Sequence, residues 1–576
     1  MDFSSKIKEA IKNAVGSDVE IELTHPTVAE HGDYATNVAM TIGGNPMEKA
    51  EEIREGIREL ETSGLVEKIE VAKPGFINFT LSKDALLDGL MQFAQDENFG
   101  VGGDLQGRKI MIEYTDPNPF KEFHIGHLFT NAVGESLARL FEFQGAEVKR
   151  ANYQGDVGLH VAKAVYGFLR VLPRAFSQEN PQGVPSWEPL LRVSPAERAK
   201  VLGQAYALGA RAYEEDPVAK EEMVSLNKKV YDEDPEIMKI YEKGREWSLE
   251  AFEKIYERLG TKFDYYYFER DTGKVGLEYV KENTGKVFEE SEGAVVFPGE
   301  KYGLHTRVFI NSQGLPTYEA KDLGLAETKY KDFPYDESVI VTGNEIKEYF
   351  KVVIKALSII NPDLGSKVRH IAHGMVRLPS GKMSSRTGDV ISGEMLLDEA
   401  KDKLLASYPE MDEATADKVG VGAVKYALLK STIGSDVVFD FDKSLSFEGD
   451  SGPYLQYTYA RCQSVLERAN LQFLISNLNS NFKFQISNLE NEELALLRSL
   501  YRFPEVVSTA ARNLAPNTIA TYLIDLASKF NAFYAKHRIL EADEEQRELR
   551  LSLTQVVGNI LKTGLNILGI QAPEKM

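Results

Sequence analysis

The chain has 576 residues and, with 67 Lys plus Arg against 88 Asp plus Glu, a formal net charge of −21. Hydrophobic residues make up 43% of it and aromatic residues 10%, which is enough for packed cores and excludes a disordered, collagen-like or low-complexity chain. The single cysteine, Cys462, excludes an intrachain disulfide and a zinc site built from several cysteines.

The N-terminal sequence and the hydropathy indicate a cytoplasmic protein. Residues 1–6 lack the charged-then-apolar order of a signal peptide, and no uncharged apolar run approaches the roughly 20 residues that span a bilayer. At about 150 residues per domain, a chain of this length is expected to fold as several domains.

Residues 1–95 are predicted to form a small α/β domain. Helical patterns cover 6–15 and 46–60, and the sequence favours strands at 19–23 and 76–81. A Gly-rich joint at 100–103 marks the boundary that follows.

Residues 108–445 are predicted to form a Rossmann-like parallel-sheet domain. A strand at 109–114, a long amphipathic helix and a strand at 147–152 make a βαβ unit, which requires a parallel sheet with helices outside it. The charge-rich segment at about 160–262 is interpreted as a helical insertion. Strand patterns that we assign to the second half of the same sheet occur at 295–297, 307–310 and 339–341.

Residues 446–576 are predicted to form an all-α bundle. Residues 453–557 contain no glycine in a chain that has 45, and tight turns and bulges are hard to build without glycine. A stripe at three-four spacing indicates the core-facing side of one helix; it consists of Ile519, Leu523, Leu526, Phe530 and Phe533. An Asn- and Ser-rich near-duplication at 473–489 is interpreted as a surface insertion without an assigned function.

The strongest local motif is His124-Ile125-Gly126-His127, between the strand and the helix of the βαβ unit. A helix N-terminus attracts anions, and imidazoles three residues apart share a face from which they can donate hydrogen bonds to a phosphate. Gly126 leaves room for a flat nucleotide base beside the backbone. Two alternatives stay open, namely a metal site with two of its ligands here and a pair that only caps the helix.

The second motif is Gly381-Lys382-Met383-Ser384-Ser385-Arg386, at the end of a strip without acidic residues that contains Lys367, Arg369, Arg377, Lys382 and Arg386. The charge of this strip fits a site for phosphate or RNA and, equally, a solvated loop. The glycines that flank residues 382–387 predict a mobile loop at 381–388, which offers an ammonium, hydroxyls and a guanidinium to a phosphate. It is not a P-loop, because Met383 follows the lysine and Arg377 stands where a glycine is needed.

Taken together, the two motifs resemble the signature sequences of class I aminoacyl-tRNA synthetases. The first matches residue for residue, and the second reads Lys-Met-Ser-Ser-Arg where the commoner form has Lys in fourth place and Ser in fifth. The sequence is also similar to the arginyl-tRNA synthetases nearly from end to end. The segments that carry this likeness are 31–37, 75–79, 116–127, 155–158, Tyr318 with Asp322, 456–461, 533–534 and 568–574.

The resemblance implies a ligase that activates L-arginine with ATP, accompanied by Mg²⁺, to arginyl-adenylate and transfers it to the 3′-terminal ribose of tRNA(Arg). It implies a monomer without a tightly bound cofactor, and it leaves open whether the activation step needs bound tRNA. The residues that it implies for catalysis are His124, His127, Lys382 and Lys121, and those for ATP binding are His124, Gly126, His127, Lys382, Ser384 and Ser385.

An arginine pocket needs carboxylates in planar reach of a guanidinium, which has five donors and a fixed charge. In the family, residues matching Glu113, Tyr318 and Asp322 hold the guanidinium, and residues matching Asn118 and His124 hold the amino-acid backbone. The alternative for each acidic residue is a surface charge or a helix cap. Ile346 stands where some relatives carry a polar ligand, so that contact is left out.

The resemblance assigns anticodon binding to the C-terminal bundle and contact with the tRNA elbow to residues 1–95. In the bundle, rings for stacking and guanidiniums for phosphates are offered by Tyr457, Arg461, Tyr534 and Arg538. These tyrosines can equally pack between helices. His31, Asp33 and Asn37 can be turn and cap residues, and no elbow contact is named.

Two rival functions remain on sequence grounds. Another nucleotidylyl-transferring enzyme could share the His-x-Gly-His loop, but it would not require Glu113, Tyr318 and Asp322 together. A non-catalytic RNA-binding relative would not require intact His124, His127 and Lys382.

Overall fold

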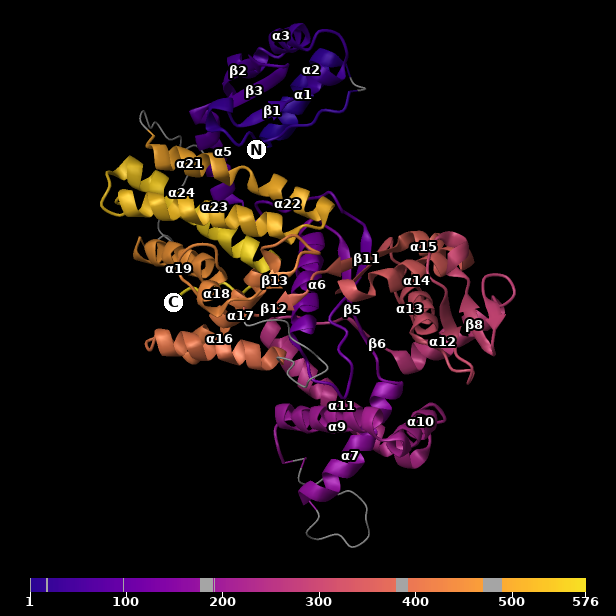
Figure 1. Ribbon diagram of the computed structural model, residues 1–576. Coiled ribbons are helices and arrows are strands. Elements are labelled where there is room, and N and C mark those ends of the chain that lie inside the picture. The colour runs from indigo at the N-terminus through magenta and orange to yellow at the C-terminus, as the bar shows by residue number, and fades with distance from the viewer. Residues whose placement is uncertain are drawn as a thin grey trace.

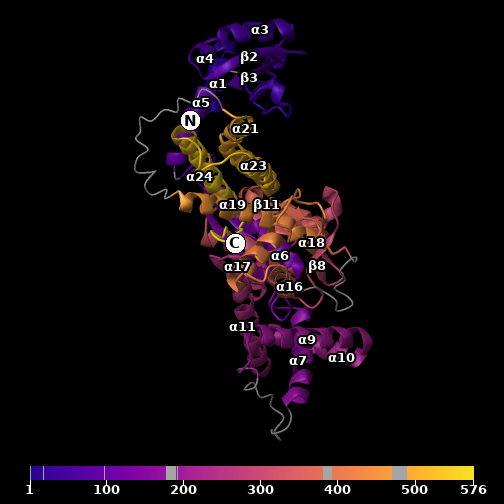
Figure 2. The ribbon, with the colours of Figure 1, turned by 90° about the vertical axis from the view of Figure 1, so that its left-hand side faces the viewer.

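The computed structural model describes residues 2–16, 19–96, 98–176, 190, 192–379, 392–469 and 489–576. Lys382, Ser384 and Ser385 of the predicted loop, and the near-duplication up to residue 488, lie outside the described residues. The molecule is elongated, with the N-terminal unit at one end, a group of helices inserted into the central domain at the other, and the C-terminal bundle between the N-terminal unit and the central sheet (Figures 1 and 2).

The N-terminal unit is a three-stranded antiparallel sheet of order β1-β3-β2 covered by helices. Its elements are α1 (Phe3–Val15), β1 (Tyr34–Thr36), α2 (Val38–Thr41), α3 (Pro46–Gly56), α4 (Glu59–Thr62), β2 (Val66–Ala72) and β3 (Phe76–Leu81). The strand predicted at 19–23 is wrong, since residues 20–23 are described and extend no ladder, and only Thr24 bridges to Ala35. Ile21 lies in the core and Val19 and Leu23 pack partly buried against it, so the alternating pattern reflects an inward-facing side of the segment without strand pairing.

The central sheet has five parallel strands in the order β11-β10-β4-β5-β6. They are β4 (Lys109–Glu113), β5 (Glu147–Gln154), β6 (Tyr265–Phe268), β10 (Glu337–Gly343) and β11 (Val368–His373). The predicted βαβ unit is present, with α6 (Ile125–Phe143) contacting β4, β5, β10 and β11. Strands β5 and β6 lie on one side of β4, and β10 and β11 lie on the other. The carboxyl end of β4 is therefore a switch point of the topology, where open α/β sheets bind ligands.

Two of the three strands assigned to the second half of this sheet belong elsewhere. A separate antiparallel sheet is formed by β7 (Glu289–Ser291), β8 (Ala294–Phe297) and β9 (Arg307–Ile310). The connections between these strands are short, and a parallel pairing needs a crossover of a dozen or more residues, so the segment folds back on itself. Only β10, at the predicted 339–341, joins the main sheet.

Helices fill the connections around the sheet. The charge-rich segment between β5 and β6 forms α7 (Leu159–Phe176), α9 (Pro195–Glu215), α10 (Pro217–Tyr231) and α11 (Pro235–Leu259). The helices between β6 and the second signature segment are α12 (Glu269–Glu282), α13 (Tyr318–Asp332), α14 (Lys347–Ile360) and α15 (Pro362–Lys367).

The C-terminal part is helical, as the missing glycines predict. It contains α19 (Gly452–Arg468), α21 (Asn491–Leu500), α22 (Phe503–Asn513), α23 (Pro516–Lys536) and α24 (Glu544–Ile567). Before it, within residues 108–445, lie α16 (Gly393–Ser407), α17 (Glu413–Leu429), α18 (Phe441–Ser444) and a short parallel pair of β12 (Val376–Arg377) and β13 (Val437–Val438). All five residues of the predicted apolar stripe are fully buried on α23. Within the described ranges, none of the helices is long and apolar enough to cross a bilayer.

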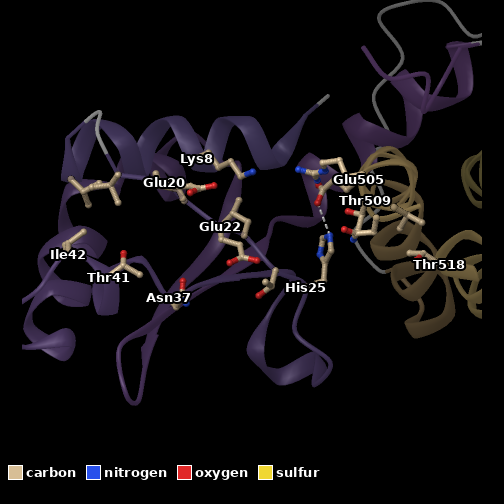
Figure 3. Close-up of a pocket in the computed structure, with 18 residues that line it drawn as sticks. Lys8, Glu20, Glu22, His25, Asn37, Thr41, Ile42, Glu505, Thr509 and Thr518 are labelled. Atoms are coloured by element: carbon tan, nitrogen blue, oxygen red, sulfur yellow. Dashed lines mark hydrogen bonds and ion pairs between the residues drawn. The ribbon is translucent and has the colours of Figure 1, made fainter. Parts of the chain in front are cut away.

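The N-terminal unit is fastened to the bundle in two ways. First, helix α5 (Lys83–Gln95) packs against α21 and α24. Second, polar side chains bridge a groove of about 1380 Å³ that lies between residues 8–42 on one side and α22 with the start of α23 on the other. Across this groove His25 Nε2 lies 3.1 Å from Glu505 Oε2, as Figure 3 shows. Asp33, from the 31–37 segment, accepts a hydrogen bond from the Leu81 N–H and pairs with Arg498 at 3.3 Å, so this segment has a structural role at the junction.

Candidate active site

The histidine pair caps the helix that it precedes. His124 is the N-cap residue of α6, and its Nδ1 accepts a hydrogen bond from the Gly126 N–H at 3.2 Å, while His127 Nδ1 accepts one from the His124 N–H at 3.2 Å. The two rings stack with centroids 3.7 Å apart. A Cβ at Gly126 would stand 3.0 Å from the His124 ring, so glycine lets that ring fold back over the helix start. The capping alternative therefore describes the observed geometry.

Capping leaves both imidazoles able to donate hydrogen bonds. Because each Nδ1 accepts a backbone N–H, the proton of each neutral ring lies on Nε2. Burial, reinforced by the charge of Lys121, lowers the pKa of His124 to about 4, and burial followed by His124 lowers that of His127 well below its usual range. At neutral pH, α6 thus begins with two Nε2–H donors. The part of the chain that the structure describes contains no cluster of three or more His, Cys, Asp or Glu residues suited to a metal.

The segment that follows the predicted loop returns to this helix start. Ser392 forms an isolated β-bridge with His124, and the Gly393 N–H donates to the Phe123 carbonyl at 2.7 Å. Lys121 is partly buried, with Nζ 5.0 Å from the Tyr206 ring centroid, and burial lowers its pKa. The described residues that follow the predicted loop, Ser392 and Gly393, therefore lie against the start of α6, and residues 381–388 themselves lie outside the described residues.

The described cations of the basic strip are already engaged within the protein. Lys367 donates to the Tyr335 carbonyl at 3.2 Å, Arg369 lies 3.7 Å from Glu337, and Arg377 lies 2.7 Å from Asp436. Lys382 and Arg386 lie outside the described residues. The three described cations are therefore paired at the protein surface, and the interpretation of the strip as a phosphate or RNA site depends on Lys382 and Arg386.

Three carboxylates surround the carboxyl end of β4, with one lysine among them. Glu113 Oε2 accepts a hydrogen bond from Lys329 Nζ at 2.5 Å, and no described residue donates to its Oε1. Asp116 accepts the Tyr153 N–H at 2.7 Å, and Asp322 accepts the hydroxyl of Tyr349 from α14 at 2.5 Å. Neither Asp116 nor Asp322 has a cationic partner within hydrogen-bond distance among the described residues.

The pKa of two of these carboxyls is raised, chiefly by burial. Burial, with repulsion from Glu113, raises the pKa of Asp116 well above its usual range. Burial also raises the pKa of Asp322, which Glu113 and Glu269 repel further while the Tyr349 hydroxyl opposes the shift. With one lysine for three carboxylates the pocket is short of positive charge, and a guanidinium with its five donors would supply it. Asp116 lies in the segment 116–127 that resembles the family. Its acidic side chain is the one sequence feature that could have placed it in the pocket.

Asn118 and Glu269 form a second polar group beside the three carboxylates. A Cβ at Gly155 would stand 2.2 Å from Asn118 Oδ1 and 2.9 Å from Glu269 Oε1, so Gly155 allows both side chains to approach. Glu269 is buried and pairs with Lys321 Nζ at 2.7 Å. Neither of these two charges belongs to a recognisable motif, which is why sequence reasoning missed them.

Tyr318 and Asp322 share a helix face at different depths. Tyr318 is the first residue of α13 and is 53% exposed, with Lys321 Nζ 4.9 Å from its ring centroid. Asp322, one turn further, reaches the buried pocket. Ile346 is 39% exposed in the short 3₁₀ helix Asn344–Ile346 and brings no polar atom to the pocket.

Three of the four residues predicted to bind RNA lie together on the bundle. The Arg461 guanidinium lies 4.8 Å from the ring centroids of both Tyr457 and Tyr534, and it bonds the Tyr457 hydroxyl at 3.2 Å. The two tyrosines are 37% and 38% exposed, so each keeps part of its ring accessible. Arg538 is apart from this cluster and pairs with Glu541 at 2.5 Å.

Comparison with known proteins agrees with this arrangement of parts. Three family models match the chain: the arginyl tRNA synthetase N terminal domain over residues 1–81, the tRNA synthetases class I (R) catalytic domain over 94–441, and the DALR anticodon binding domain over 455–576.

Proteins named arginine–tRNA ligase match over nearly the whole length. The one from Clostridium acetobutylicum is 31% identical and covers 100% of both chains, and the one from Fusobacterium nucleatum is 33% identical over 96% of this chain and 95% of its own. The structure of Thermus thermophilus arginyl-tRNA synthetase superimposes with a TM-score of 0.79 at 25% identity, covering 99% of this chain and 100% of that one. The chain therefore belongs to the arginyl-tRNA synthetases, which carry the class I catalytic domain.

Proposed function

We propose that the charge-deficient pocket at the end of β4 is the arginine site of this ligase. As a member of its family, the chain activates arginine with ATP and charges tRNA. The observation that carries the residue assignment is the pair of half-buried carboxylates, Asp116 and Asp322, without a cationic partner among the described residues, in the same domain as two imidazole donors.

In the first step an oxygen of the arginine carboxylate attacks the α-phosphorus of ATP, and the bond from that phosphorus to pyrophosphate breaks. Negative charge grows on the phosphate oxygens, so the protein has to position and stabilise them. We assign Nε2–H of His124 and His127 to these oxygens, and Lys121 and Lys382 to the leaving pyrophosphate. Gly126, Ser384 and Ser385 complete the ATP site, and Mg²⁺ accompanies the nucleotide.

The guanidinium is held between Tyr318, Asp322 and the Oε1 atom of Glu113, which Lys329 leaves open. Asn118 and His124 hold the backbone of the amino acid. In the second step a terminal ribose hydroxyl of the tRNA attacks the carbonyl carbon of the adenylate, and AMP leaves.

The domain roles follow the same proposal. Residues 1–95 contact the tRNA elbow, residues 108–445 form the catalytic domain with its insertion at about 160–262 and its loop at 381–388, and residues 446–576 bind the anticodon. Tyr457, Arg461 and Tyr534 form one RNA contact, and Arg538 forms a second. We place the protein in the cytoplasm as a monomer.

ATP–pyrophosphate exchange with each of the twenty amino acids, with and without tRNA(Arg), tests the proposal. Exchange with arginine alone is expected. Exchange driven by another amino acid would reject the pocket assignment, and no exchange in any condition would leave only RNA binding. A related nucleotidylyl transferase would consume ATP without dependence on arginine.

A further inference from the structure

A polar junction lies on α6, two to three turns beyond the histidine pair. Arg139 donates from Nε to Glu135 Oε1 at 2.6 Å, from Nη2 to the Gly260 carbonyl at 2.8 Å, and from Nη1 to Asn566 Oδ1 at 2.6 Å and the Asn566 carbonyl at 3.2 Å. Gly260 directly follows α11, the last helix of the insertion, and Asn566 lies in the last turn of α24, the last helix of the bundle. One guanidinium therefore joins three parts of the molecule.

A buried lysine repeats this connection from a second helix. Lys425 of α17 donates from Nζ to the Leu259 carbonyl at 2.6 Å and to the Gly569 carbonyl at 2.7 Å. Burial lowers its pKa to about 7. Gly569 has φ +68°, and a Cβ there would stand 3.1 Å from Lys425 Nζ, so glycine lets the chain turn against the ammonium. The ends of α11 and α24 are thus held together twice.

The hydrogen-bond network of Arg139 extends through Glu135 to the carboxyl end of β4. Glu135 Oε2 accepts the Tyr114 hydroxyl at 2.5 Å and Arg150 Nε at 3.1 Å. Tyr114 directly follows Glu113, and its side chain fills the space above Gly134, where a Cβ would stand 2.2 Å away. Arg139 lies twelve residues after His127 on one continuous helix, a rise of about 18 Å at about 1.5 Å per residue. A shift of α6 at Arg139 is therefore also a shift of its first turn.

We propose that Arg139 is a positioning residue, which passes the placement of the bundle's last helix to the histidines at the start of α6 and, through Glu135 and Tyr114, to the end of β4. The contacts go to carbonyls at helix ends, which have no partner within their own helix and move with it. A guanidinium that bonds two such helix ends and Glu135 of α6 fixes their relative positions, whereas apolar packing would tolerate small displacements. The inference rests on the proposed function, because it concerns the charging of tRNA by this site.

The test compares charging of tRNA(Arg) transcripts with the native and with an altered anticodon. Asn566→Ala removes one acceptor of Arg139, and Asn566→Asp keeps it. We expect Asn566→Ala to shrink the ratio of the two kcat values at least about fivefold, the lower end of measured couplings between sites. The KM values for arginine and ATP should stay within about twofold, and Asn566→Asp should restore the ratio. Asn559→Ala, at an exposed position of the same helix, should change nothing.

Three outcomes would overturn the proposal. These are an equal loss of kcat with both transcripts, no change with either, and a wild-type enzyme that does not distinguish the two anticodons. If Asn566→Ala fails to fold, Arg139→Lys keeps the charge next to Glu135 without the fork and should shrink the ratio in the same way. A wild-type enzyme that charges no tRNA with arginine would instead refute the proposed function.

Discussion

Glu135 on α6 is a buried carboxylate of the catalytic domain and Asp322 on α13 is a half-buried one, and their surroundings carry opposite balances of charge. Burial alone would raise the pKa of Glu135, yet Arg150 and Arg139 together lower it. The pKa of Asp322 is raised by burial, and other carboxylates raise it further. A carboxylate with more cations than it needs holds the fold together, whereas one without a cation is a site that a positively charged ligand completes.

The largest effect on stability is expected for Glu135→Gln. Removing one partner from a buried charge network leaves the others unpaired, so the free energy of unfolding should fall by about 3 kcal/mol. Urea denaturation measures it, and the matched control is Glu142→Gln. Glu142 also bonds Arg150, at 2.6 and 2.8 Å, but is 40% exposed, so its loss should cost under about 1 kcal/mol. Equal losses in both variants would mean that burial does not decide the effect.

Asp322→Asn should act on the substrate and spare the fold. We expect kcat/KM for arginine to fall about 30- to 1000-fold, because truncating one partner of a buried charge pair costs about 2–4 kcal/mol. The KM for ATP should not change, and the free protein should be no less stable, since it loses an uncompensated charge. Asp332→Asn, at the exposed end of the same helix, is the control for pyrophosphate exchange. An unchanged KM for arginine would remove Asp322 from the pocket.

The contributions of the pocket carboxyls, Asp116 and Asp322, and of Glu135 to stability should respond to pH in opposite directions. Above the ordinary pKa of 3.8, free protein keeps protons on Asp116 and Asp322 that the unfolded chain has released, so their contribution to stability declines as pH rises through the raised pKa. The contribution of Glu135 is present above its ordinary pKa and is lost as pH falls through the lowered one.

Arginine needs the ionised carboxylates, so its affinity should rise with pH, by at most about tenfold per pH unit for each proton released. Calorimetric titration in two buffers of different ionisation enthalpy measures that release. Binding without proton release throughout the weakly acidic range would mean that both carboxyls are already ionised in the free protein.

The elements that could be predicted from the sequence are those whose pattern is local. The β4–α6–β5 unit and the glycine-free bundle follow from periodicity and composition, and His124 with His127 follows from its place between strand and helix. The sheet that β8 and β9 join could not be predicted, because alternation identifies a strand without naming its partner. The charge balance of the pocket is also non-local, since Lys329 neutralises Glu113 across 216 residues of sequence.

The smallest effect on the free energy of unfolding is expected for Glu505→Gln, because water can solvate the Glu505 carboxylate. Glu505 faces His25 across the groove beneath the N-terminal unit, with side chains 32% and 24% exposed. Glu505→Gln keeps an oxygen for the Tyr34 hydroxyl, so the change in unfolding free energy should stay below about 1 kcal/mol. A double-mutant cycle with His25→Ala isolates the pair. Because solvent can stabilise this carboxylate, it needs neither the cations that hold Glu135 nor the ligand expected at Asp322, and a coupling as large as that at Glu135 would contradict burial as the deciding factor.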